Sequence, residues 1–348
     1  MNSLTIALAG LGGVVLAGVV AHGAWQARKA GPRRAEEAPP EQREPVLESA
    51  AERTEPSMTT SDRDESPLPV MPRRASLRID ALIDAIATLT LEAPVSGEMV
   101  LAHLPSTRRA GSKPFLIEGL NAETGEWESP ASGQHYSELQ VGVQLANRTG
   151  AMNEIEYSEF VQKIEPFAEA IGAMSDFPDM LDAASRAREL DAFASQCDAQ
   201  LAVHLQARSA SWSVGYIQQH AARHGFVPGM VPGRLVLPAA EEGAPPVLTL
   251  TFDSQAALAE DANKAAVRDA TLSFDVPQTA AAVAPFVAWQ ASAQALSLGM
   301  DAAIVDDNGQ ALHPQGFAAI GNELGQLYEK LDAHDLAAGS AAARRLFS

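Results

Sequence analysis

The sequence has very little cysteine, few aromatic residues and no excess of positive charge. Cys197 is the only cysteine, so no intrachain disulfide can form, and we interpret this residue as a small buried one. Aromatic residues make up 5% of the chain, which leaves few platforms for stacking nucleic-acid bases. The formal net charge of -19 excludes nucleic acid as an expected partner and disfavours contact of the body with an anionic membrane, because both need a positive face.

The motifs of common enzyme classes are also missing. The chain has no phosphate-cradling glycine loop with lysine, no GxSxG elbow and no dinucleotide fingerprint. His220 and His224 have the spacing of a metal-binding pair, but Ala-Ala-Arg lies between them and no third ligand is evident. The run from Asp306 to Gly309 lacks the closing acid of a calcium loop, so we interpret it as a turn. We therefore predict a protein that is not an enzyme, with no catalytic residue, no cofactor and no metal.

An uncharged apolar run at residues 4–25 is the feature around which the chain is organised. It reads LTIALAGLGGVVLAGVVAHGAW, and about 20 apolar residues suffice for a helix to cross roughly 30 Å of hydrocarbon. We predict a single transmembrane helix. Arg28, Lys29, Arg33 and Arg34 follow it, which places the N-terminus outside and the body in the cytoplasm. A cleaved signal peptide is the alternative, but it would carry basic residues before the apolar run.

Residues 26–75 are rich in proline, glutamate, arginine and serine and show no apolar period. Such a segment cannot bury enough apolar surface to offset its ordering entropy, so we predict a disordered tether. Random-coil scaling gives it a span of roughly 35–40 Å.

Two α+β modules are expected after the tether, each an antiparallel sheet with helices on one face. The first, at 76–195, has alternating strand patterns and amphipathic helix patterns. Its strands are expected within 78–91, 113–119 and 136–146, and its helices at 98–104, 153–174 and 180–195. The two modules share an order of elements, which fits either a diverged duplication or coincidence.

The second module is expected at 196–338, with a tail at 339–348. Its strands are expected at 200–206, 234–237, 245–252, 270–276 and 302–305, and its helices at 213–224, 281–298 and 314–336.

The strands at 245–252 and 270–276 present small polar side chains on the face away from their apolar residues. These are Thr249, Thr251, Thr271 and Ser273, and Val231 lies among glycines and prolines where it could rim this face. One interpretation is a merely solvated sheet face. The other is a docking platform for a partner peptide, since small side chains let a peptide approach closely.

Several local patterns of the second module resemble the ZipA-like family of bacterial division proteins. They are VLTLTF at 247–252, ATLSFDVP at 270–277 and AAIVDDNGQALHPQGFAAI at 302–320, together with the anchor, the tether and the Gly225-Phe226 step. The resemblance implies a protein of the cell inner membrane that tethers FtsZ and works with other division proteins. It also implies that the C-terminal tail peptide of FtsZ binds the exposed sheet face.

This sequence departs from the family pattern in two ways. The first module is additional, and the outward positions Thr251, Asp253 and Ser273 are polar where the family has an apolar groove. Val231 is the apolar position that carries over. Our leading hypothesis is a membrane-anchored adaptor for FtsZ. The alternatives are a membrane-tethered enzyme using His220, His224 or Asp306, and an inner-membrane scaffold with an unrelated partner.

Overall fold

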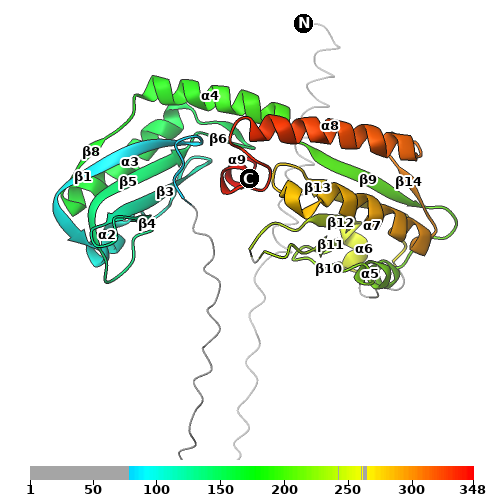
Figure 1. Cartoon of the computed structure of the whole chain (residues 1–348). Coiled ribbons are helices and arrows are strands. Elements are labelled where there is room, and N and C mark those ends of the chain that lie inside the picture. Colours follow the sequence, from blue (N-terminus) through cyan, green and yellow to red (C-terminus); the bar gives the residue numbers. More distant parts are fainter. Residues whose placement is uncertain (1–77, 242, 260, 262–264) are drawn as a thin grey trace, which may run out of the picture. The chain divides into compact units, whose positions relative to one another are not determined.

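Two antiparallel sheets, each packed against helices, form the described part of the chain (Figure 1). The computed structural model describes residues 78–348 apart from residues 242, 260 and 262–264. The membrane helix predicted at 4–25 and the tether predicted at 26–75 lie outside these residues. Among the residues described, no helix is both long and apolar enough to cross a bilayer. The predicted α+β class with antiparallel sheets is confirmed.

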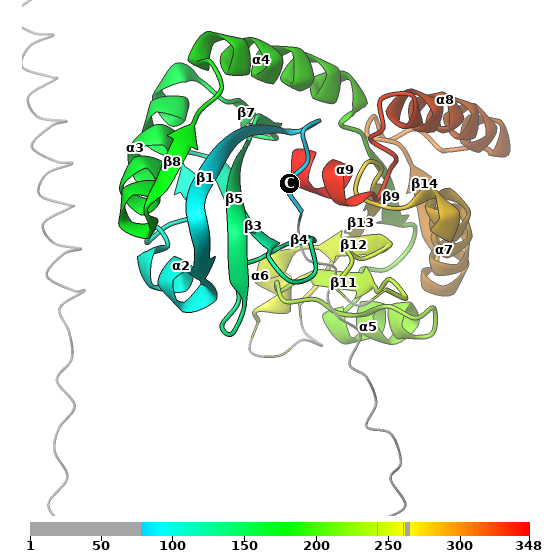
Figure 2. The ribbon, with the colours of Figure 1, turned by 60° about the vertical axis from the view of Figure 1, so that its left-hand side comes forward.

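The first sheet has the strand order β2-β3-β5-β1-β8, with β4 paired to β3. Helix α3 lies beside β8 (Figure 2). The elements of this module are β1 (Asp84–Ser96), α2 (Gly97–His103), β2 (Arg109–Ala110), β3 (Lys113–Asn121), β4 (Trp127–Glu128), β5 (His135–Gln144), β6 (Ala146–Asn147), β7 (Gly150–Ala151), α3 (Glu154–Ile171), β8 (Ala173–Asp176) and α4 (Met180–Cys197).

The core of the first module follows from the alternation in its central strands. Ala87 pairs with Val141 and Leu89 with Leu139, and all four side chains are fully buried on one face of the sheet. Helix α3 covers this face with an apolar stripe of period 3.6. The buried aromatic and aliphatic residues of that stripe are Tyr157, Phe160, Ile164, Phe167 and Ile171.

The predicted helix at 153–174 is wrong at its C-terminal end. Helix α3 starts with a capping box between Asn153 and Glu156, but it stops at Ile171 because Gly172 adopts a left-handed conformation with φ 71°. Residues 173–176 then form β8, which pairs with β1 at the sheet edge. A four-residue edge strand directly after a helix has too few residues to show a period of its own.

The second sheet has the strand order β10-β11-β12-β13-β9-β14. Helix α7 runs alongside β13 and β14 (Figure 1). The elements are β9 (Gln200–Ala207), α5 (Val214–Ala222), β10 (Val227–Pro228), β11 (Arg234–Leu237), β12 (Leu248–Phe252), α6 (Ser254–Ala257), β13 (Asp269–Asp275), the 3₁₀ turn η1 (Ala281–Val283), α7 (Pro285–Met300), β14 (Ala302–Val305), α8 (Pro314–Asp332) and α9 (Ala341–Leu346).

Trp289 on α7 is the centre of the second core. Its side chain is fully buried, its Nε1 donates to the carbonyl oxygen of Leu272 at 2.9 Å, and its ring contacts Phe274 and Phe317. The helix that carries it, predicted at 281–298, starts at Pro285 instead. Ala284 is left-handed, and Pro285 begins the helix at the position that proline favours.

The two modules have the same topology. Strand order β3-β5-β1-β8 in the first corresponds to β12-β13-β9-β14 in the second, and both follow the split β-α-β arrangement with α2 and α3 equivalent to α5 and α7. The registers also correspond, since Val141 lies between Ala87 and Ile117 as Leu272 lies between Val203 and Leu250. The expected shared order of elements is therefore present, and a common origin of the modules stays a hypothesis.

The C-terminal residues predicted as a tail include helix α9. Its Arg345 is 8% exposed and pairs with Asp84 at the start of β1, while Gln144 Nε2 donates to the Arg345 carbonyl oxygen at 2.7 Å. Leu346 and Cys197 belong to the same buried apolar cluster. Cys197 is buried as predicted, and this burial raises the pKa of its thiol.

Candidate functional site

The register of the second sheet brings four of the predicted site residues onto one face. Thr249 pairs with Ser273 and Thr251 with Thr271, so these side chains share the face opposite the buried residues Leu250 and Leu272. The three threonines are half-buried, whereas Ser273 is only 6% exposed. Solvent thus reaches this face, called the open face below, at its threonines and hardly at its serine.

Sequence reasoning missed a histidine on this open face. His204 of β9 is hydrogen-bonded through Nδ1 to Thr271 Oγ1 at 3.1 Å and through Nε2 to Asp307 Oδ1 at 3.0 Å. Asp269 Oδ2 lies 3.9 Å from Nδ1. The alternation in QLAVHLQ places His204 between buried Val203 and Leu205, which was the available signal. These bonds link the strands β9 and β13 of the face to the turn that follows β14.

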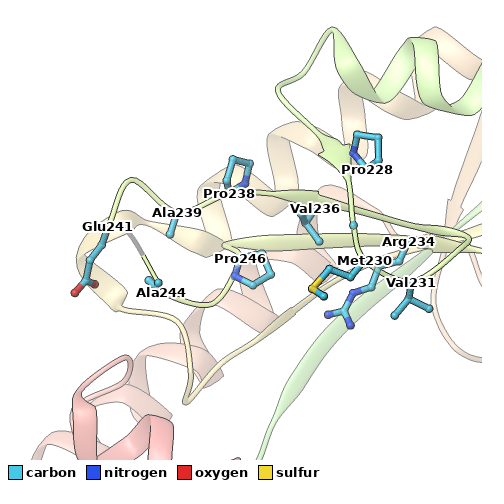
Figure 3. A pocket seen from close by; sticks show the side chains of 12 residues that line it. Pro228, Met230, Val231, Arg234, Val236, Pro238, Ala239, Glu241, Ala244 and Pro246 are labelled. Carbon is cyan, nitrogen blue, oxygen red and sulfur yellow. The ribbon is translucent and has the colours of Figure 1, made fainter. Parts of the chain in front are cut away.

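An apolar groove lies at the β10–β11 end of this sheet (Figure 3). Its volume is about 590 Å³. Val231, which we predicted at the rim of the sheet face, lines this groove, and the four polar face residues do not. Arg234 connects the two regions, because it lines the groove and its Nη2 donates to Thr249 Oγ1 at 3.4 Å. The lining residues are Pro228, Gly229, Met230, Val231, Arg234, Val236, Pro238, Ala239, Glu241, Gly243, Ala244 and Pro246.

A tight turn builds the wall of the groove. Gly229 N donates to the Arg234 carbonyl oxygen at 2.8 Å, and Arg234 N donates to the Val231 carbonyl oxygen at 3.1 Å. Gly233 has φ +78°, and a Cβ there would lie 2.6 Å from the Phe252 carbonyl oxygen, so the turn needs glycine. The turn leaves Met230 fully exposed and Val231 54% exposed. The glycines and prolines of this turn therefore hold two apolar side chains in contact with water.

Two charged side chains line the groove, and they differ in their partners. Glu241 accepts from Arg344 Nη2 at 3.3 Å, which satisfies part of its charge. Arg234 is exposed and has the long 3.4 Å bond to Thr249. Its guanidinium carries five donors, so most of them remain directed to solvent. The groove can therefore hold an apolar chain and one carboxylate.

The corresponding face of the first module is covered by the chain itself. Glu118 and Gln140 occupy the register positions of Thr251 and Thr271. Glu118 is 2% exposed, accepts from Ile79 N at 3.1 Å, and lies 3.4 Å from Arg78 Nε. The side chain of Ile79 lies over Gly142, where an added Cβ would be 2.7 Å from its Cγ2. Residues 78 and 79 thus cover the position of the first module that corresponds to the half-buried Thr251 of the second.

The histidines of the catalytic alternative lie at the C-terminal end of α5 and just after it, and its aspartate lies in the turn after β14. The ring of His220 packs at an angle against that of Tyr216 with centroids 4.3 Å apart, and burial lowers the pKa of His220. Asp306 Oδ1 accepts from the backbone of Asn308 and Gln310 at 2.9 and 2.8 Å, which confirms the predicted turn. In the part of the chain that the structure describes, no group of three or more His, Cys, Asp or Glu side chains could hold a metal ion.

The fold and the groove define a class: paired split β-α-β modules, the second with an open sheet face and an adjoining apolar groove. A scan against protein-family models finds no match, and a search of the curated proteins finds no relative.

Proposed function

We propose that this protein is a membrane-anchored adaptor that tethers FtsZ to the cell inner membrane by binding its C-terminal tail peptide. The observation that carries the proposal is the apolar groove beside the open face of the second sheet. The family resemblance of the surrounding strands supplies the identity of the partner. The apolar run at 4–25 supplies the anchor, and residues 26–75 supply the reach.

The groove and the face offer complementary chemistry to an extended peptide. Apolar peptide side chains would lie against Val231, Met230 and Val236. Arg234 would pair with a peptide carboxylate, because guanidinium and carboxylate form charge-assisted bonds of high directionality. The hydroxyls of Thr249 and Thr251 would bond to the peptide backbone. In this arrangement the apolar contacts lie at the β10–β11 end of the sheet, whereas the family pattern has them on the sheet face.

Weak individual sites are sufficient for this role. FtsZ forms polymers, so many tails face many anchored heads on one membrane. Linked binding events gain from effective concentration, and avidity can exceed single-site affinity by about 10²–10⁴-fold when the linker spans the sites. A small groove on a tethered module is consistent with such a design.

The test measures binding of a fluorescein-labelled FtsZ tail peptide to the full chain in lipid nanodiscs, by fluorescence anisotropy. Val231→Asp should weaken binding at least about tenfold, since it places a carboxylate in an apolar contact site. Leu258→Asp is the matched control, because Leu258 is an apolar side chain of the same module, 70% exposed and outside the groove. Equal affinity of the two variants, or no binding by the unmodified chain, would remove the proposal.

A further inference from the structure

Two topologically equivalent pairs of helices in the two modules differ in charge. Helices α2 and α3 of the first module carry six glutamates, and helices α5 and α7 of the second carry no aspartate or glutamate. The six are Glu98, Glu154, Glu156, Glu159, Glu165 and Glu169. In a chain with net charge -19, a pair of helices without a carboxylate is a local departure from the composition.

The α5–α7 face also exposes large apolar side chains. We use this name for the solvent side of α5, η1 and α7, where Val283 is 46%, Val287 64% and Leu298 87% exposed. Tyr216 of α5 is 38% exposed and donates through its hydroxyl to the Gly299 carbonyl oxygen at 3.0 Å, which ties the two helices together. Buried Ile217 and Trp289 fix the opposite sides of both helices in the core. The exposed apolar residues therefore cannot turn inward.

The α5 side of this face carries a basic group at its rim. Arg223 and His224 follow the end of α5 and are exposed. The carboxylate that follows α7 belongs to Asp301, and its Oδ2 accepts from Ser209 Oγ at 2.7 Å. Helix α8, which packs against α7, carries the exposed Glu323 and Glu329, so the basic edge lies on the α5 side. An apolar centre with an arginine at its edge is a pattern of surfaces that lie in the headgroup region of a membrane.

We propose that the α5–α7 face docks on the surface of an anionic bilayer. Burying Val287 and Leu298 at the acyl boundary removes apolar area from water, while Arg223 pairs with lipid phosphates. The α2–α3 face is excluded from this role by its glutamates, which an anionic surface repels. This inference rests on the proposed function, because the predicted anchor and tether keep a bilayer within reach of the body.

Docking in this way orients the candidate site. Helices α5 and α7 pack on the buried face of the second sheet, and Thr249, Thr251 and Arg234 lie on its other face. A module resting on its helices would therefore present the open face and the groove away from the lipid. The membrane contact and the peptide contact would use opposite sides of one sheet and could be made together.

The experiment places a fluorophore at single positions of the full chain and measures its quenching by nitroxide-labelled lipid in vesicles. Leu298→Cys reports on the α5–α7 face. Ile155→Cys on α3 is the matched control, because Ile155 is 81% exposed on the equivalent layer of the first module. Met230→Cys reports on the groove. Native Cys197 is buried, so the dye labels the added cysteine.

We expect strong quenching at Leu298 and weak quenching at the other two positions in vesicles with anionic lipid. Adding Val287→Glu should lower the docked-to-undocked ratio about fivefold, the effect of one charge near such a surface. Equal quenching at all three positions, or equal quenching at Leu298 in purely zwitterionic vesicles, would overturn the proposal. A lipid-independent emission change that grows with protein concentration would assign the face to a second copy instead.

The outcome is separable from that of the proposed function. The quenching readout contains no FtsZ, so a failure of tail binding leaves it unaffected. A failure of the anchor would show as protein that does not float with the vesicles.

Discussion

Arg345 and Asp84 form a two-point ion pair between the last helix and the first strand of the described chain. Arg345 Nη1 donates to Asp84 Oδ2 at 2.8 Å and Nη2 donates to Oδ1 at 2.5 Å, with 8% and 0% of the two side chains exposed. Arg345 Nη1 also donates to the Arg78 carbonyl oxygen. The residues are 261 positions apart, so the C-terminal helix α9 completes the first module.

Removing one partner of this ion pair should lower the stability of the fold. We predict that Arg345→Met lowers the free energy of unfolding by about 3–5 kcal/mol, because it leaves the Asp84 carboxylate buried without its cation. Arg344→Met is the neighbouring control; its pair with the exposed Glu241 should contribute less than about 1 kcal/mol. Urea unfolding followed by circular dichroism measures both. A loss at Arg345 no larger than that at Arg344 would contradict the role assigned to the pair.

Glu156 should give the protein a specific acid sensitivity. Burial opposes its ionisation, but hydrogen bonds from Ser112 Oγ, Ser112 N and Asn153 N outweigh burial and hold the pKa of Glu156 below its ordinary value. A carboxylate with a lowered pKa stabilises the fold above its unfolded pKa and loses that contribution as the pH falls through the folded one.

We therefore predict that the free energy of unfolding of Glu156→Gln depends less on pH than that of the parent protein. The variant should be less stable than the parent at pH 7, and the difference should shrink as the pH falls from about 5 towards 3. Glu169→Gln, an exposed position near the end of the same helix, is the control and should follow the parent curve. A pH-independent difference between parent and Glu156→Gln would show that the carboxylate charge is not involved.

Gly233 should be required for the shape of the groove. Gly233→Ala places a Cβ 2.6 Å from the Phe252 carbonyl oxygen at φ +78°, so both strain and a backbone clash result. We expect a loss of about 2 kcal/mol or more of unfolding free energy, together with weaker tail-peptide binding. Gly309→Ala has φ +75° with no atom within 4 Å of the added Cβ, so it should cost about 1 kcal/mol and leave binding unchanged.

Much of the second sheet could be predicted because its strands alternate cleanly. The patterns at 248–252 and 270–276 gave both the strands and the shared face of Thr249, Thr251 and Thr271. Strand β8 and helix α9 could not be found in this way. Each is six residues or shorter, and each is stabilised by partners distant in sequence.

Only part of the groove could likewise be predicted from the sequence. Val231 was recognisable as an apolar residue among glycines and prolines, and it does line the groove. The other wall comes from Pro238, Ala239, Glu241, Gly243, Ala244 and Pro246. The sequence around them has no periodic pattern, and they meet the turn only in the folded chain. Likewise, the partners of His204 come from β13 and from the turn after β14, and strand pairing alone brings them together.

The most direct test of the adaptor proposal is flotation of FtsZ polymers with vesicles that carry the full chain. The proposal predicts that polymers rise with these vesicles and stay at the bottom with vesicles that carry Val231→Asp, while Leu258→Asp behaves like the parent. Polymers that remain at the bottom with the parent chain, although the chain itself floats, would contradict the tethering role.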